Sequence, residues 1–193
     1  MPADAAQPWR RGELTTPLGP LVLVEDAAGR LRAAEWLDAE SRLAHWLARQ
    51  CLDHVPQSVT VDALAASAPL TDYFAGALSR LDDIAVALRG TPLQQAVWSA
   101  LRMLRAGETR SYGALAASLG RPRAARAVGA ANAANPCAVV VPCHRLVGTD
   151  GALTGYAGGL ARKRWLLAHE AGPAGVNLSG PARPAASWRA RCC

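Results

Sequence analysis

The chain has 193 residues, of which 51% are hydrophobic, so it can form one domain of ordinary size or two small ones with a buried core. No apolar run approaches the roughly 18 residues of a membrane-spanning helix, and the first residues lack the basic and apolar regions of a secretory signal. The net charge of +6 conceals a division between the two halves. Residues 1–90 carry 8 basic and 12 acidic side chains, whereas residues 91–193 carry 13 basic and 3 acidic ones, a net charge of +10. A basic half suits a polyanion such as nucleic acid, although a surface that only keeps the protein in solution is the alternative.

The five cysteines, at positions 51, 137, 143, 192 and 193, form neither a disulfide framework nor a zinc-ligand pattern. Cys51 and His54 are three residues apart, but no second ligand pair has comparable spacing. We therefore expect no metal, no cofactor and a reducing compartment, the cytoplasm.

The first half has the alternation of strands and helices expected of a small α/β domain. The strands are expected at 21–24, 31–36 and 84–88, and the helices at 40–51 and 69–81. Gly90-Thr91-Pro92 then marks the start of another helix, with Thr91 as its N-cap. Because the charge balance also changes sign here, we place a domain boundary between residues 1–89 and 90–171.

The second half is predicted to be mostly helical, with helices at 93–104, 112–119 and 123–133. The last two are short and flank the break at Gly120, which suggests a helix-turn-helix. The segment from Arg126 to Asn135 contains almost only small side chains, which let a helix approach either a protein core or a DNA groove closely. The basic residues Arg121, Arg123 and Arg126 at its start favour DNA. Residues 172–193, rich in Pro, Ala, Gly and Ser, are expected to form a flexible tail.

The most informative motif is Val141-Pro-Cys-His-Arg145, which follows the β-branched run from Ala138. The run predicts a buried strand that Pro142 ends, with Cys143 at the strand end beside His144. A free thiol has a pKa of about 8.5, so only about 3% of it is thiolate at neutral pH, and a neighbouring base would activate it. The alternative is a small buried cysteine next to an exposed loop histidine.

From Gly90 to Glu170 the chain closely resembles the O6-alkylguanine-DNA alkyltransferases, also called methylated-DNA–protein-cysteine methyltransferases, and most closely their bacterial constitutive branch. The matching blocks are Gly90-Thr-Pro-Leu-Gln94, Val97-Trp98, Gly107-Glu-Thr-Arg-Ser-Tyr-Gly113, Ala125-Arg-Ala-Val-Gly129, Asn135-Pro136, Val141-Pro-Cys-His-Arg145, Gly155-Tyr-Ala-Gly-Gly159 and Lys163-Arg-Trp-Leu-Leu-Ala-His-Glu170. Asp72-Tyr-Phe-Ala-Gly76 extends the resemblance into the first half. The resemblance implies a ribonuclease-H-like α/β domain followed by a winged-helix-like helix-turn-helix domain.

The resemblance also implies a direct and irreversible repair reaction. Cys143 would take the alkyl group from O6 of guanine, and each molecule would act once. His144 would accept the thiol proton through a bound water, Glu170 would orient His144, and Tyr156 would donate to N3 of the base. Asn135 would tie the turn before the cysteine. The base pocket would comprise Tyr156, Ala157, Leu146 and Val147, with O4-alkylthymine as a second candidate lesion.

The implied partner is double-stranded DNA that contains O6-alkylguanine, bound by a monomer, with cooperative binding along DNA as a further expectation. The damaged nucleotide would be flipped out through the minor groove. Arg126 would fill the vacated stack, Tyr112 would push the flanking phosphate, and Arg123 would contact the backbone. The small residues facing the groove would be Ala127, Gly129, Ala130 and Ala131.

Three other functions compete with this interpretation. A non-enzymatic protein that binds alkylated DNA would carry Trp in place of Cys143, and a helix-turn-helix regulator would not need Cys143, His144, Tyr156 and Glu170 together. A cysteine hydrolase would need an oxyanion site that the sequence does not reveal. Leu93 and Leu146 depart from the Phe and Val usual in the family, and both exchanges are apolar.

Overall fold

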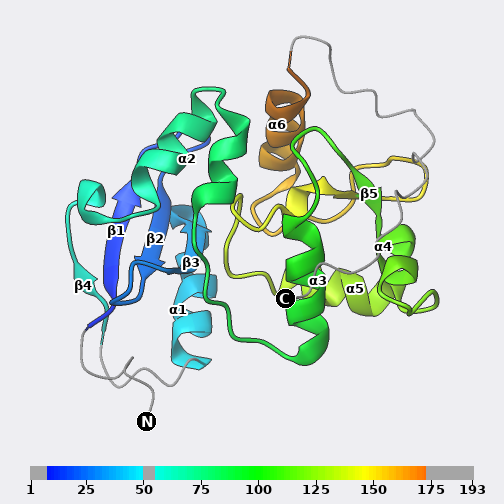
Figure 1. Ribbon diagram of the computed structural model, residues 1–193, viewed down its shortest axis with the longest axis horizontal. Helices are drawn as coiled ribbons and strands as arrows, with labels where there is room; N and C mark the ends of the chain where they lie inside the picture. Colours follow the sequence, from blue (N-terminus) through cyan, green and yellow to red (C-terminus); the bar gives the residue numbers. More distant parts are fainter. Residues whose placement is uncertain (1–7, 50–54, 173–193) are drawn as a thin grey trace.

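The computed structural model describes residues 8–49 and 55–172. Four strands form the first sheet: β1 (Arg10–Leu14), β2 (Leu21–Glu25), β3 (Leu31–Trp36) and β4 (Gln57–Ser58). Their order is β3-β2-β1-β4, with antiparallel pairing of β1 with β2 and of β2 with β3, and parallel pairing of β1 with β4. Figure 1 shows β1, β2 and β3 of this sheet in blue on one side of the molecule. The mixed α/β class predicted from the sequence is confirmed.

Both faces of the sheet are covered, because alternate side chains of its central strands point to opposite sides. Val22, Val24 and Ala33 pack with Leu43 of helix α1 (Glu40–Arg49) in a small cluster. The opposite face contributes Leu21 and Leu23 to a larger core that continues into the second half of the chain. A single large core thus joins the sheet to the helices that carry the predicted site.

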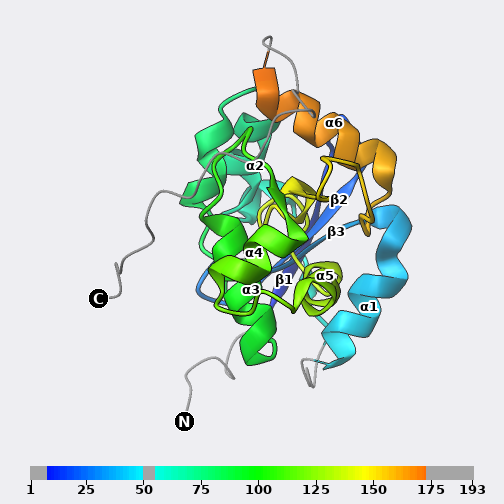
Figure 2. The same ribbon diagram turned by 90° about the vertical axis from the view of Figure 1, so that its right-hand side faces the viewer.

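The second half consists mainly of helices α3 (Pro92–Arg102), α4 (Tyr112–Ser118), α5 (Ala125–Ala133) and α6 (Leu160–Ala171), with α2 (Ser67–Phe74) preceding them. Strands β5 (Arg110–Ser111) and β6 (Leu146–Val147) pair in parallel. In Figure 2, α3, α4 and α5 lie in front of the sheet, and α1 lies beside α5. Within the described residues, 3₁₀ helices lie at Leu37–Ala39, Val61–Ala63, Leu78–Asp83 and Cys143–Arg145.

The predicted start of α3 is confirmed, because Thr91 and Gln94 form a reciprocal capping box with Pro92 at the first helical position. Ser111 caps α4 by accepting a hydrogen bond from the Ala114 amide. Gly120, with φ of 71°, makes the left-handed break that separates α4 from α5. These local signals explain why the helix-turn-helix pair was predictable from sequence.

Two predicted elements of the first half are corrected. The helix expected over 69–81 ends at Phe74, because Gly76 has φ of 108° and a separate 3₁₀ helix follows. The strand expected at 84–88 is reduced to one bridge, between Val86 and Leu31. The division at residue 90 stays a prediction, and so does the flexible tail, whose residues 173–193 lie outside the described chain together with Cys51 and His54.

No helix within residues 8–49 and 55–172 is long and apolar enough to cross a membrane. The same residues contain no group of three or more His, Cys, Asp or Glu side chains that could hold a metal ion.

Candidate active site

Cys143 lies at the start of a 3₁₀ helix that follows a tight buried turn. The strand predicted for residues 138–141 was wrong: these residues are buried, but they form successive turns in which Val139 has φ of 70°. The Asn135 side chain holds the turn by donating to the carbonyls of Cys137 (3.2 Å) and Val141 (2.9 Å) and accepting from the Cys137 amide (3.0 Å). Side-chain hydrogen bonds of this kind offer the backbone an alternative to regular strand pairing. They fix the backbone that leads into Cys143.

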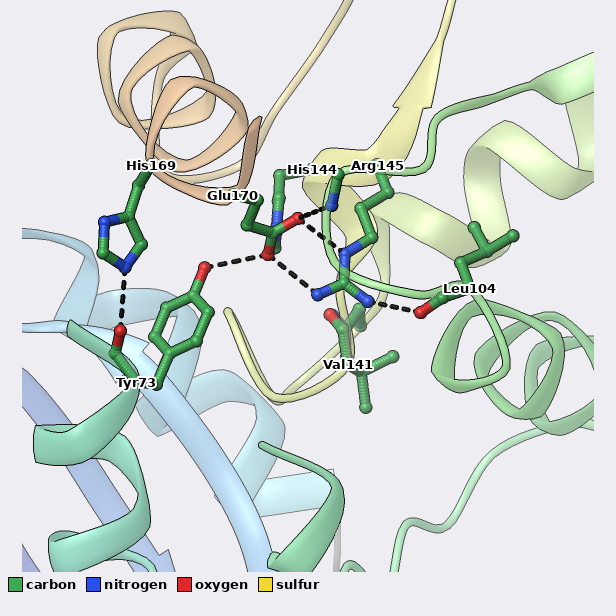
Figure 3. A network of polar contacts seen from close by, with 9 residues as sticks. Tyr73, Leu104, Val141, His144, Arg145, His169 and Glu170 are labelled. Carbon is green, nitrogen blue, oxygen red and sulfur yellow. Dashed lines mark hydrogen bonds and ion pairs between the residues drawn. The ribbon is translucent and has the colours of Figure 1, made fainter. Parts of the chain in front are cut away.

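A buried carboxylate, Glu170 of α6, is the centre of the polar network shown in Figure 3. Its Oε1 lies 2.8 Å from Nε2 of His144 and accepts hydrogen bonds of 2.8 Å from the Tyr73 hydroxyl and from Arg145. Its Oε2 accepts a second bond from Arg145 (2.8 Å) and one from the Gly107 amide (3.3 Å). The guanidinium therefore binds the carboxylate in the bidentate manner that is strongest for this pair.

The network determines the protonation of its members. Burial alone would raise the pKa of Glu170, but the charges and hydrogen bonds of His144 and Arg145 outweigh burial and hold that pKa well below its ordinary value. An ionised carboxylate only accepts hydrogen bonds, so the His144 Nε2 facing it must carry the hydrogen. When the ring is neutral, Nδ1 is then the bare acceptor. This atom is buried and has no partner among the described residues.

The Cys143 thiol is almost completely buried. Burial raises its pKa to about 11, an effect that the Asn135 side chain and the charge of Lys163 only partly offset. The resting thiol is consequently protonated at neutral pH, and a reaction at sulfur requires a base that removes the proton. His144 follows Cys143 directly in the same 3₁₀ helix and has a free acceptor nitrogen.

A cavity of about 560 Å³ opens beside Cys143. Its lining includes Tyr156 and Ala157 of the loop before α6, and Tyr112, Arg126 and Gly129 of the helix-turn-helix pair. The Tyr156 hydroxyl is buried without a hydrogen-bond partner in the described part of the chain, and burial raises its pKa, so it remains a donor. The volume suits a small planar ligand such as a nucleobase.

Two residues predicted for the base pocket do not line this cavity. Leu146 and Val147 are buried in β6 and are not part of the cavity lining. Lys163 links this strand to the cavity loop, since its buried ammonium donates to the carbonyls of Leu146 (2.5 Å) and Thr154 (2.6 Å). Burial lowers the pKa of Lys163 to about 8.

The small residues of α5 divide between two faces. Arg126, Ala127 and Ala130 are exposed, as is Arg123 just before the helix, whereas Gly129 is half-buried. A Cβ added to Gly129 would lie 3.8 Å from the Tyr112 ring, in ordinary contact. Ala131, which was expected among the small residues facing the groove, is buried instead, and its carbonyl accepts a hydrogen bond from Trp98 (2.9 Å). Ala131 follows Ala127 by four residues, slightly more than one helical turn of about 3.6 residues, so its side chain is rotated from that of Ala127 toward α3.

Arg126 has no carboxylate partner among the residues that the structure describes. The alternative that it serves as one half of an internal ion pair therefore receives no support from the fold. Its exposed guanidinium at the cavity rim is free to contact an external ligand.

Comparisons with known proteins agree with this geometry. The model of the 6-O-methylguanine DNA methyltransferase DNA-binding domain matches residues 92–172. A methylated-DNA–protein-cysteine methyltransferase of Salmonella typhimurium is 49% identical over 164 residues, which cover 82% of this chain and 93% of the relative. A Mycobacterium bovis protein of the same name is 45% identical over 86% of this chain and 94% of its own length. The chain belongs to the methylated-DNA–protein-cysteine methyltransferase family.

Solved structures of this family share the fold. The O6-methylguanine methyltransferase of Mycobacterium tuberculosis superposes with a TM-score of 0.71 at 40% identity, covering 88% of this chain and 97% of that one. The OGT of the same organism in complex with DNA gives a TM-score of 0.70 at 38% identity, covering 90% and 96% of the two chains. The resemblance seen in the sequence motifs is thereby confirmed over both halves of the chain.

Sequence reasoning overlooked several buried polar residues of the site. Tyr73, Arg145 and Lys163 each lie inside a motif block that was recognised, yet no role was assigned to them. Their types gave a usable signal, because a buried charge or phenol needs a partner. What the sequence did not contain was the information that they would be buried.

Proposed function

We propose that this protein repairs double-stranded DNA by transferring the alkyl group of O6-alkylguanine to Cys143 in a single turnover. The observation that carries the proposal is the buried thiol of Cys143, next to a histidine–glutamate pair and beside a cavity that opens at the exposed face of α5. A regulator that only binds DNA has no use for this arrangement. The family membership and the DNA complex of the Mycobacterium tuberculosis OGT support the same function.

The chemistry is a displacement at the alkyl carbon. His144, through Nδ1 and a bound water, takes the proton of Cys143, and the thiolate attacks the carbon attached to O6. The carbon–sulfur bond forms as the carbon–oxygen bond breaks, and guanine leaves with the electron pair. Glu170 stabilises the imidazolium that results. Because a thioether has no ready leaving group, the protein is consumed.

Tyr156 is suited to help the leaving group. Its buried hydroxyl lacks a partner in the described chain, lies at the cavity and remains protonated. We assign it the role of donating to N3 of guanine, which offsets the negative charge that develops on the departing base. The backbone around Cys143 and Leu146 would read the guanine edge.

Access to O6 requires that the nucleotide leave the duplex stack, at a cost of a few kcal/mol. We propose that α5 enters the minor groove with Ala127 and Ala130 facing the bases, and that Arg126 fills the space left by the flipped nucleotide. Tyr112 would push the flanking phosphate, and Arg123 would contact the backbone. In this proposal the two halves correspond to a ribonuclease-H-like domain and a winged-helix-like domain.

The small side chain of Ala157 leaves room beside the alkyl group, so we propose that ethyl and somewhat larger adducts are accepted, with O4-alkylthymine as a second lesion. An apolar pocket discriminates one methylene by only about 1–3 kcal/mol. We further propose that the protein acts in the cytoplasm as a monomer. Titration of DNA with the protein measures whether binding along DNA is cooperative.

Intact mass after reaction tests the function directly. Mixing the protein with an O6-methylguanine duplex should add the mass of one methylene unit, located by peptide mapping on Cys143, and the modified protein should not react again. A Cys143→Ala variant should gain no mass. Continued turnover, or modification of Cys137 instead, would overturn the proposal.

The flipping step has its own test. Arg126→Ala should slow repair of duplex DNA by much more than reaction with free O6-benzylguanine, because only the duplex requires a nucleotide to be extruded. Single-turnover rates on both substrates measure the difference. Equal losses on the two substrates would show that Arg126 supports the fold and takes no part in flipping.

A further inference from the structure

The first half of the chain supplies one direct contact to the proposed proton relay. The Tyr73 hydroxyl, on α2, donates to Oε1 of Glu170 at 2.8 Å, and the same oxygen lies 2.8 Å from His144 Nε2. The other donors to this carboxylate, Arg145 and Gly107, belong to the second half. Figure 3 shows Tyr73 approaching Glu170 from the side opposite Arg145.

Tyr73 is held rigidly in this position. Its side chain is completely buried, and its backbone carbonyl lies 2.8 Å from Nε2 of His169, the residue that precedes Glu170. The rings of Tyr73 and His169 also meet edge to face, with centroids 5.2 Å apart. Two polar contacts therefore join α2 to α6 beside the carboxylate: the Tyr73 hydroxyl contacts Glu170, and the Tyr73 carbonyl contacts His169.

The phenol can act only as a donor here. Burial, followed by the negative charge of Glu170, raises the pKa of Tyr73, so the hydroxyl keeps its proton throughout the range in which the protein works. Its hydrogen bond competes with that of His144 for the electron density of one oxygen. Removing the bond would make the carboxylate both freer to rotate and a stronger proton attractor.

We propose that Tyr73 is a positioning residue for alkyl transfer, which orients Glu170 and moderates its pull on the His144 proton. The inference rests on the proposed function of the histidine–glutamate pair. Through this bond the packing of α2 against α6 would determine how readily Cys143 loses its proton. The groups that face Glu170 are Tyr73 from α2, His144 and Arg145 from the 3₁₀ helix, and the Gly107 amide.

The test is the pH dependence of single-turnover reaction with free O6-benzylguanine, which avoids any effect on DNA binding. In Tyr73→Phe, which keeps the ring and its packing, the rate at neutral pH should fall about tenfold, the effect of losing one hydrogen bond to a charged group. The rate should fall at low pH in both proteins, and the midpoint of this fall (the acid limb) should lie about one unit higher in the variant, because the His144–Glu170 pair holds its proton more strongly.

A variant on the same helix provides the matched control. Leu70→Val removes one methylene from a completely buried side chain of α2 that makes no polar contact with the relay. It should lower the melting temperature and leave the acid limb in place. If Tyr73→Phe behaves like Leu70→Val, the role of Tyr73 is structural and the inference fails. If the unmodified protein itself does not react with O6-alkylguanine, the proposed function fails instead.

Discussion

At the scale of single residues, the site is organised around the buried carboxylate of Glu170. A carboxylate taken out of water is costly unless it is paired and hydrogen-bonded, and Glu170 is both. Burial alone would favour the protonated form, yet Arg145 and His144 reverse the direction of the pKa shift. Because Glu170 is ionised, His144 keeps its hydrogen on Nε2, which faces the carboxylate, and Nδ1 is left as the acceptor.

Replacing Glu170 with Gln should destabilise the protein by about 3 kcal/mol at neutral pH, because the guanidinium of Arg145 would remain buried without its counter-ion. The pKa of Glu170 is lowered in the folded state from an ordinary value of 4.5, so its stabilisation is fully present above that pH and is lost as the pH falls further. Urea unfolding at about pH 7 and about pH 3.5 should therefore show a smaller difference between variant and parent at the lower pH. A difference that stays constant would contradict this account.

At the scale of elements, the cavity loop before α6 is tied to both halves of the chain. Lys163 holds the Thr154 carbonyl, and Arg162 donates to the Gly158 carbonyl (3.2 Å) while it pairs with Asp38 (2.9 Å). The Arg162 guanidinium also lies 4.5 Å from the centre of the Trp36 ring. The position of Tyr156 in this loop thus depends on contacts from the sheet as well as from α6.

Two glycines of this loop allow a matched comparison. A Cβ at Gly158 would lie 2.5 Å from Nε1 of Trp36 and 2.8 Å from Cε1 of Tyr156, whereas a Cβ at Gly155 would meet nothing within 4 Å. Gly158→Ala should consequently displace the loop, at a cost of about 1–3 kcal/mol, and slow transfer from free O6-benzylguanine. Calorimetry should show a lower melting temperature for Gly158→Ala and none of that loss for Gly155→Ala. Equal melting temperatures would mean that the loop accommodates the methyl group.

At the scale of the whole molecule, the positive charge lies in the half of the chain that contains the exposed helix beside the cavity. The half that is net +10 contains α5, and three arginines at its start, Arg121, Arg123 and Arg126, are exposed. The acidic half contributes the sheet and α2, which lie on the side of the site away from α5 (Figure 1). A protein built in this way is expected to bind DNA mainly through phosphates, with little dependence on base sequence.

The salt dependence of DNA binding measures this surface. If the three arginines each contact a phosphate, the logarithm of the affinity should fall with the logarithm of salt concentration with a slope of about −3 or steeper. Arg123→Ala should reduce the magnitude of the slope by about one. Arg80→Ala, which removes an exposed arginine paired with Asp72 and Asp83 in the first half, should leave it unchanged. A slope near zero in the parent protein would contradict phosphate-based binding.

Much of the secondary structure could be predicted because its signals are local. The β-branched run at 21–24, the apolar spacing of α1 and α3, and the cap at Thr91 each act within a few residues. Strand β1 was not predicted, since in Arg10–Leu14 only Gly12 and Leu14 are buried, and the strand forms through pairing with β2. The run at 138–141 looked like a strand because its residues are apolar. Only the Ala138 amide pairs with β3, at the Ala34 carbonyl, and the chain then turns at Val139, with the Val141 carbonyl bound by the Asn135 side chain.

The sequence by itself determined the family, the Val141-Pro-Cys-His-Arg145 motif and the basic half, because these depend on residue types in a fixed order. Only the tertiary structure decided which of these residues meet. Tyr73 and Glu170 are separated by 97 positions yet share a hydrogen bond, and Ala131 faces the core although Ala127 and Ala130 of the same helix are exposed. The physical reason is that burial and hydrogen-bond partnership belong to the packed molecule: a carboxylate becomes the centre of a buried hydrogen-bond network only when distant segments close around it and exclude water.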